Sequence, residues 1–254
     1  MYYDRLMQSI IDVGEYMVRC GAEVARAEDS IERMLVAYGF PEFRVNVFII
    51  VSNIQVTAEA PDGRIITQIR RMIKSDVNFD RLDYLNDLCR KVCSEKFEPE
   101  EIQRRISEIM NRPEPRLRSL ISGSALVTAG FCLFFGGSLR DAAAAAVMGV
   151  VIMLVEMIVE RTESNSLVVN FIVSLIAGIV AILLVKAGLG VDKDTIMIAG
   201  IMILIPGIAL TNAVRDMLAE EQTTGLLRFT NALLVSAAIA GGFALAIILL
   251  GGAL

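Results

Sequence analysis

The fold is decided by residues 195–218, which read TIMIAGIMILIPGIALTNAVRDML. Residues 195–214 carry no charged side chain, and a helix of about 20 apolar residues is long enough to cross a membrane. Pro206 and Gly207 stand near the middle of the run. At about 1.5 Å per residue, this position lies close to the bilayer midplane. The stretch therefore predicts a transmembrane helix that is broken at its centre.

Charged side chains divide the chain into two parts. Residues 1–118 hold 18 of the 24 Lys and Arg residues and 20 of the 29 Asp and Glu residues, so the longer second part is nearly free of charge. This division is typical of a water-exposed domain followed by a membrane domain. Short charged breaks separate the apolar runs of the second part. They predict an all-α membrane bundle of five transmembrane helices at 119–138, 142–159, 167–189, 195–218 and 229–250.

The N-terminal part shows two periodicities. Apolar residues recur at helical spacing along 4–20 and 22–38, and then alternate along 43–51, beginning with Phe43, as in a strand. Pro61-Asp62-Gly63 predicts a turn between two further strands, at 54–60 and 64–69, and two helices follow at 80–96 and 99–110. The pattern predicts an α+β cytosolic domain of order αα-βββ-αα. An acidic cluster on the second helix is interpreted as a solvated face or as a docking surface: Glu23, Glu28, Asp29 and Glu32.

The two parts meet at a segment rich in proline and arginine. Its two prolines disfavour helix, and its arginines stand directly before the first apolar run. We predict a cytosolic domain at 1–111, a hinge at 112–118 and a membrane domain at 119–254. With the N-terminal domain in the cytosol, six basic residues flank the spans on the cytosolic side and three on the other, in agreement with the positive-inside rule. We therefore expect a multi-pass protein of the cell (plasma or inner) membrane.

Missing residues and motifs argue against several functions. The chain has no histidine, so it lacks the usual general base and the commonest metal ligand. It has no Gly-rich loop ending in Lys-Ser/Thr and no Gly-x-Ser-x-Gly elbow. A net charge of −5 argues against a nucleic-acid partner. We therefore expect no enzyme, no cofactor and no metal site, and we interpret the scattered cysteines as reduced packing residues: Cys20, Cys89, Cys93 and Cys132.

Small residues recur at a spacing of four in several predicted spans. Ala145 and Gly149 form one such pair, and Ala238 and Gly242 form another. In lipid, small side chains let helix backbones approach closely. The pattern predicts a tightly packed bundle.

Pro206 and Gly207 are the first candidate for a functional site. Transporters bind substrates at helices that are broken near the midplane, where the positive end of the second half-helix suits a carboxylate. The alternative is a kink that serves packing alone.

Polar residues follow the break on the same predicted helix. Asn212 and Asp216 share one face, and Thr211 and Arg215 share another. The charged pair is interpreted either as an anchor at the membrane surface or as a gate or relay in the cytosolic vestibule. As part of a site, Arg215 would bind a substrate carboxylate or hold Asp216 through two parallel hydrogen bonds, which lysine cannot reproduce.

Two other spans carry polar candidates. Glu156 lies about one turn before the cytosolic end of the second span, where it either snorkels to the surface or forms a buried proton or ion site. Asn170 and Ser174 in the third span are weaker candidates, because polar residues often bond simply between helices.

The residues after the break also carry a family resemblance. PGIALTNAVRD at 206–216, followed by GLLR at 225–228 and an Ala/Gly-rich last span, resembles the threonine/serine exporter family. GAEVARAE at 21–28 and the β segment after Gly39 are similar to that family's cytosolic domain. The resemblance extends over nearly the whole chain.

The resemblance implies transport. Long family members carry two five-span halves, and this sequence resembles the first, so it looks like the split form that works beside a second, short five-span membrane subunit, or failing that with itself. Family substrates are small hydroxy amino acids and, in split relatives, dicarboxylates such as succinate. We expect a subunit of a secondary-active exporter of a small carboxylate metabolite. The alternative is a membrane-anchored sensor or scaffold with a cytosolic partner-binding domain, and a membrane enzyme has the least support.

Overall fold

The computed structural model describes residues 2–250 apart from 51–52, 73–76, 114, 164 and 220–221. The chain divides into two compact units, one formed by Met1–Pro113 with Thr211–Phe229 and the other by Glu114–Leu210 with Thr230–Leu254. Thr211–Phe229 therefore packs with the N-terminal domain, whereas the pattern of apolar runs placed it in the membrane domain. The polar contacts responsible are described with the candidate site.

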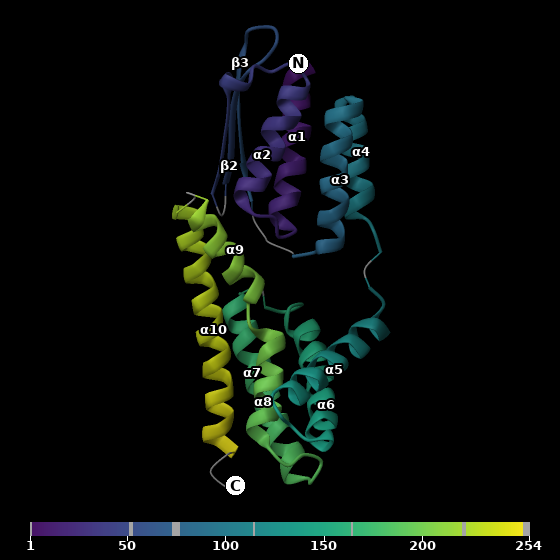
Figure 1. Cartoon of the computed structure of the whole chain (residues 1–254), viewed down its shortest axis with the longest axis vertical. Helices are drawn as coiled ribbons and strands as arrows, with labels where there is room; N and C mark the ends of the chain where they lie inside the picture. The colour runs from purple at the N-terminus through teal and green to yellow at the C-terminus, as the bar shows by residue number, and fades with distance from the viewer. Residues whose placement is uncertain are drawn as a thin grey trace. The chain divides into compact units, whose positions relative to one another are not determined.

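Three layers build the N-terminal part of the first unit (Figure 1). The middle layer consists of α1 (Tyr2–Arg19) and α2 (Val24–Ala37). One side of this layer contacts a three-stranded sheet, and the other contacts α3 (Phe79–Glu95) and α4 (Pro99–Met110). The helices lie within two residues of the ranges expected from the apolar periodicity.

The sheet is antiparallel, in the order β1-β2-β3. Its strands are β1 (Val45–Ile50), β2 (Asn53–Glu59) and β3 (Ile65–Arg71). Alternate residues of β2 point toward the helices, and Ile54, Val56 and Ala58 are fully buried. The turn at 61–63 forms as predicted, with Gly63 at a φ of +81°.

One strand prediction was wrong at its start. Phe43 was placed on the inner side of a strand, but it belongs to a short 3-10 helix, Glu42–Arg44, and is 84% exposed. Pro41 starts this turn, because Arg44 N–H donates to the Pro41 carbonyl over 2.9 Å. The alternation begins only at Val45, and Val51 lies outside the described residues.

The packed face of α1 is the one that its periodicity predicts. Leu6, Ile10 and Met17 have no exposed surface. The helix ends at Gly21, whose φ of +102° lets Ala22 N–H donate to the Met17 carbonyl over 2.9 Å. Burial of such side chains, at about 25 cal/mol per Å² of apolar surface, is the main stabilisation of this domain.

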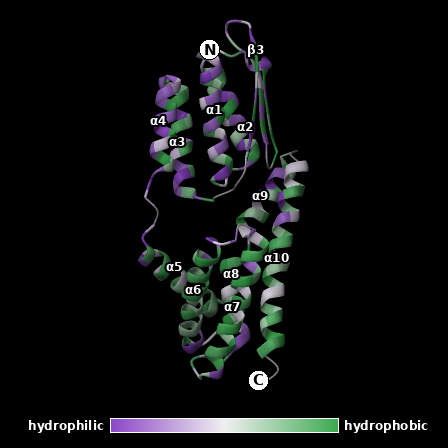
Figure 2. Ribbon diagram, turned by 180° about the vertical axis from the view of Figure 1, so that it is seen from behind, coloured by the Kyte–Doolittle hydropathy of each residue, from purple (hydrophilic) through white to green (hydrophobic). Residues whose placement is uncertain are grey.

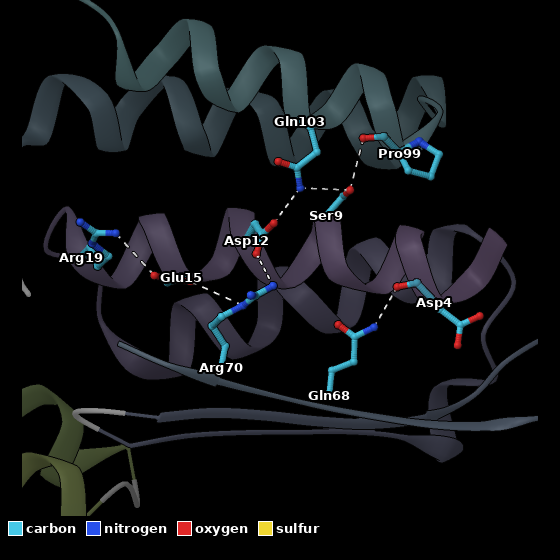
Figure 3. Close-up of polar contacts among 9 residues, drawn as sticks. All are labelled: Asp4, Ser9, Asp12, Glu15, Arg19, Gln68, Arg70, Pro99 and Gln103. Carbon is cyan, nitrogen blue, oxygen red and sulfur yellow. Dashed lines mark hydrogen bonds and ion pairs between the residues drawn. The ribbon is translucent and has the colours of Figure 1, made fainter. Parts of the chain in front are cut away.

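A polar cluster crosses the outer part of this core (Figure 3). Arg70 on β3 donates to Asp12 on α1 over 2.7 Å, and its Nε lies 3.8 Å from a Glu15 oxygen. Gln103 on α4 donates to Asp12 over 2.7 Å and to Ser9 over 3.2 Å. The cluster joins all three layers. Burial raises the pKa of Glu15, although Arg19 and Arg70 act in the opposite direction.

The second unit is helical and strongly apolar, as the hydropathy colouring of Figure 2 shows. Its helices are α5 (Leu117–Phe134), α6 (Leu139–Val159), α7 (Ser166–Lys186), α8 (Lys193–Leu204) and most of α10 (Gln222–Leu250). Within the described residues, α5, α6, α7 and α10 are each long and apolar enough to cross a membrane. A fifth span results if α8 and the bent continuation α9 (Gly207–Leu218) count as one. Several candidate membrane helices and a small sheet are thus confirmed, while the count of five stays a prediction.

Glycine positions bring the helices of this unit close together. A Cβ built on Gly149 of α6 would lie 2.7 Å from the Ser124 carbonyl oxygen of α5. A Cβ built on Gly242 of α10 would lie 2.6 Å from the Phe171 carbonyl oxygen of α7. The backbones meet where the small-residue pattern predicted close packing.

A buried carboxylate, which the sequence analysis did not single out, closes one end of this unit. Asp141 in the first turn of α6 is 2% exposed. Its Oδ2 accepts hydrogen bonds from Ser138 N–H (3.0 Å) and Ser138 Oγ (2.6 Å). Its Oδ1 accepts from the N–H groups of Val191 (2.6 Å) and Asp192 (3.0 Å). The local signal was present, because Ser138 and Asp141 have the spacing of a capping box.

Candidate functional site

The predicted break between α8 and α9 is present. Helix α8 ends at Leu204, and Ile205 takes an extended ψ of 127°, as expected for a residue before proline. Helix α9 starts at Gly207, and the pair is bent by 52°. Proline lacks the N–H that would continue the helix, which explains the position of the bend.

The first turn of α9 lies open. Gly207, Ile208 and Ala209 are exposed, and Pro206 is half-buried. A Cβ built on Gly207 meets no described atom within 4 Å. The start of this 12-residue helix is therefore exposed within the described part of the chain, and the Gly207 N–H donates to the Ile205 carbonyl over 2.8 Å.

The polar residues after the break contact the connection between α1 and α2. Asn212 Nδ2 donates to the Gly21 carbonyl over 3.2 Å. Arg215 pairs with Glu23, and both side chains are partly exposed. These partners lie more than 190 positions away in the chain.

Asp216 is the buried centre of this group, with 1% of its surface exposed. Its Oδ2 accepts a hydrogen bond from Arg228 Nη1 over 2.8 Å, and its Oδ1 accepts one from the Val24 N–H over 3.4 Å. The sequence offered Arg215 as a partner of Asp216, but the ion pair forms with Arg228 on α10, twelve residues further on. Arg228 was counted as a basic flank and as part of the GLLR motif, and no periodicity of a single helix relates it to Asp216.

The acidic cluster at the start of α2 is partly solvated and partly bonded within its own unit, and its interpretation as a regulatory or partner-docking surface stays a prediction. Glu23 pairs with Arg215, and Glu28 accepts a hydrogen bond from the Ile49 N–H over 2.7 Å. Asp29 pairs with Arg33 on the exposed surface over 2.8 Å. Part of the cluster therefore docks other elements of the same unit.

The remaining predicted site residues belong to the second unit. Glu156 on α6 is half-buried, with Glu160 one turn later on the same helix. Asn170 on α7 donates to the Ser166 carbonyl over 2.8 Å, and Ser174 is buried and donates to the Asn170 carbonyl over 2.7 Å. Both α7 groups therefore bond within their own helix.

The chemistry of these groups is that of binding and coupling. Within the described residues, no group of three or more His, Cys, Asp and Glu side chains is placed to hold a metal ion, and the four cysteines are free. The geometry places an exposed helix start at 206–207 and a polar and charged cluster at 212–216 on the same helix.

Comparison with known proteins identifies a family. The model of the threonine/serine exporters (ThrE) matches residues 8–250. The chain is 22% identical over 244 residues to the "Threonine/serine exporter" of Corynebacterium glutamicum, covering 92% of this chain and 49% of that protein. It is 25% identical over 244 residues to the "Probable threonine/serine exporter" of Mycobacterium tuberculosis, covering 94% of this chain and 45% of that protein. The chain thus spans about half the length of these two relatives.

A shorter relative matches over most of its length. The "Probable succinate transporter subunit YjjP" of Klebsiella aerogenes is 25% identical over 238 residues, covering 93% of this chain and 90% of that protein. No solved structure shows a significant match.

Proposed function

The chain belongs to the threonine/serine exporter family, and on that premise we propose that it is a subunit of a secondary-active exporter of small metabolites that bear a carboxylate. The family is one of transporters, not enzymes. The observation that carries the proposal is the bent pair α8–α9, with an exposed helix start at Gly207. Transporters bind substrates at membrane helices that are broken near the midplane, and the positive dipole end of the second half-helix suits a carboxylate.

The proposed site is built around the break. Pro206 and Gly207 supply the open backbone, and Asn212, Arg215 and Asp216 stand on the same helix. Glu156 on α6 is the proposed proton or ion site, because a carboxylate in a membrane helix commonly marks an ion pathway. Asn170 remains the weakest member, since its amide already bonds within α7.

The names of the relatives support two chemical classes of substrate. Two are named threonine/serine exporters and one is named a succinate transporter subunit. Threonine, serine and succinate share a carboxylate on a short polar skeleton. The proposed substrate is therefore a small hydroxy amino acid or a dicarboxylate.

A second membrane subunit is part of the proposal. The word "subunit" in the name of the YjjP relative supports it. We expect this partner to be a short five-span protein, and self-association is the alternative. The proposed location is the cell membrane, with the N-terminal domain in the cytosol and the basic flanks of the spans on the same side.

Transport in vesicles tests the proposal. The chain is co-expressed with the membrane protein encoded beside its gene, reconstituted, and loaded with labelled threonine, serine or succinate. Efflux of one of these, and its loss when the proton gradient is collapsed, is the expected result. Pro206→Ala is expected to lower efflux at least tenfold at normal membrane levels. Efflux that ignores the collapsed gradient would refute the coupling, and no efflux of any of the three would refute the substrate class.

The second candidate is a membrane-anchored sensor. The observation that favours it is the packing of Thr211–Phe229 with the N-terminal domain, which ties that domain to the helix after the break. In a sensor, threonine, serine or succinate would shift the melting temperature of the purified chain without any flux in vesicles. Flux of a substrate decides against it.

A further inference from the structure

The N-terminus of α2 is capped by a side chain from a distant segment. Glu23 occupies the N-cap position, but its side chain makes no capping hydrogen bond. The Val24 N–H instead donates to Asp216 Oδ1 over 3.4 Å. The first N–H groups of a helix have no partner within the helix, and the positive end of the dipole favours a carboxylate there. Asp216 thus caps the N-terminus of α2, although it lies 192 residues after Val24 in the chain.

The buried carboxylate is itself neutralised. Asp216 is 1% exposed, and Arg228, with 18% of its side chain exposed, donates to it over 2.8 Å. A buried charge without a partner is strongly destabilising, so the helix start, Asp216 and Arg228 depend on one another. The three groups come from α2, α9 and α10.

Weaker contacts surround this buried pair. Asn212 donates to the Gly21 carbonyl over 3.2 Å, and Arg215 pairs with Glu23. Thr224, which is fully buried, donates to the Ile49 carbonyl over 3.4 Å. Each contact joins Thr211–Phe229 to the N-terminal domain, so this segment and residues 1–113 form one compact unit.

The contacts lie on the helix that begins at the break. Helix α9 carries Gly207 at its start and Asp216 near its end, nine residues or about 14 Å further along. An α-helix of this length moves as a rigid rod, whereas Pro206 leaves the connection to α8 without one helical hydrogen bond. Any movement of the N-terminal domain that keeps these contacts must therefore also move the helix start at Gly207.

We propose that these contacts form a latch between the N-terminal domain and α9, which opens and closes as α9 pivots at Pro206 during transport. The latch consists of Gly21, Glu23 and Val24 on one side and Asn212, Arg215, Asp216 and Arg228 on the other. The N-terminal domain is then a moving part of the transporter. The inference rests on the proposed function for its role in transport, but the contacts themselves are testable without any substrate.

Hydrogen exchange in the full-length chain tests the contacts. Asp216→Ala is expected to speed exchange of the first-turn amides of α2 about tenfold, the usual effect of losing a helix cap. Glu23→Arg and Arg215→Glu are each expected to speed it about threefold, because an exposed ion pair contributes little. The double variant Glu23→Arg/Arg215→Glu restores the pair with its charges exchanged, and exchange should return to the wild-type rate. Arg33→Glu, which breaks the exposed pair with Asp29, is the control and should leave these amides unchanged.

Wild-type exchange in Asp216→Ala, or a double variant no better than its singles, would overturn the latch. Arg215→Lys keeps a cation opposite Glu23, and the first-turn amides of α2 should exchange in this variant at the wild-type rate. This expectation differs from the one drawn from sequence, in which Arg215 held Asp216 through a planar fork.

A reversible cross-link tests the role in transport. The four native cysteines are replaced by alanine, and Glu23→Cys with Arg215→Cys are joined by a short cleavable bis-maleimide. Cross-linking is expected to lower efflux at least tenfold, and cleavage should restore it. The control joins Arg5→Cys and Glu100→Cys, which replace an exposed ion pair between α1 and α4 and do not involve α9. Full efflux from the cross-linked Glu23/Arg215 protein would overturn the opening of the latch.

The two experiments separate the two proposals. No efflux from the wild-type chain would refute the proposed function and, with it, the role of the latch in transport. The exchange rates would still decide whether the latch contacts exist.

Discussion

Asp141→Asn is expected to open one end of the second unit. The carboxylate of Asp141 accepts four hydrogen bonds, two at each oxygen, from Ser138, Val191 and Asp192. Asparagine keeps one acceptor oxygen and presents N–H donors at the other position. The Ser138 hydroxyl can rotate to accept, but a backbone N–H cannot, so at least one buried donor is left opposite another donor.

The magnitude follows from the bonds that are lost or weakened. A hydrogen bond to a charged group contributes about 1.5–3 kcal/mol; in the variant one of the four bonds becomes a donor–donor contact, and the other three weaken because the side chain is no longer charged. We expect a loss of about 3 kcal/mol, which corresponds to about a hundredfold in the equilibrium for local opening. The residue is 2% exposed, so water cannot replace the missing partners while the loop stays closed.

Cys132 supplies the assay. Its thiol is fully buried, and its Sγ would lie 2.6 Å from a Cβ built on Gly137, the residue before Ser138. Maleimide labelling of Cys132, followed by peptide mass spectrometry in mild detergent, reports opening of this loop. We expect labelling about a hundredfold faster in Asp141→Asn than in wild type, if labelling requires that opening. The matched control is Asp194→Asn, which removes an exposed carboxylate from the first turn of α8. Equal labelling rates in Asp141→Asn and wild type would refute the reasoning.

Three further predictions concern packing and charge. Gly242→Ala is expected to lower the melting temperature in detergent by several degrees, because its Cβ would lie 2.6 Å from a backbone oxygen of α7. The Cβ of the control variant Gly241→Ala meets no described atom closer than 3.5 Å, so this variant should be mild. Equal melting temperatures of the two variants would contradict the prediction. Burial raises the pKa of the Cys89 thiol to about 12, so at pH 8 only about one thiol in 10⁴ is ionised, and Cys89 should label at least a hundredfold more slowly than a free cysteine at that pH. Arg70→Met leaves Asp12 and Glu15 without their shared cation and should destabilise the N-terminal domain by about 1–2 kcal/mol in urea unfolding. The loss of stability should shrink as the pH falls below the raised pKa of Glu15, because a protonated Glu15 no longer needs a cation. A loss of stability that is constant with pH would contradict the role of Glu15.

Elements with strong local signals were predictable. Pro99 begins α4 and Gly21 ends α1, because proline suits the first helical turn and glycine the left-handed conformation after a helix. The start of β1 was not predictable, since alternation continues through Phe43 even though a 3-10 turn interrupts the strand there. Alternation reports which side chains match a strand, and it does not report whether the backbone is extended.

The candidate site divides in the same way. The break at Pro206 and Gly207 was predictable from sequence, because proline lacks the backbone N–H that continues a helix. The contacts of Asp141 were predictable only in part. Its capping box with Ser138 is local, whereas Val191 and Asp192 lie 50 and 51 positions away in the chain. The partner of Asp216 was assigned to its neighbour Arg215, although adjacent residues on a helix point about 100° apart and seldom pair.

The sequence by itself determined the apolar character of the second part, the small α+β domain before it and the broken helix, and its motifs carried the family resemblance. The first three properties depend on composition, on periodicity and on residues that constrain their own backbone, all of which are local. Only the tertiary structure decided that Thr211–Phe229 packs with the N-terminal domain, that Asp216 pairs with Arg228, and that Asp216 caps α2. Those contacts join groups up to 192 positions apart, and their partners are chosen by where folding brings the chain rather than by any spacing along it.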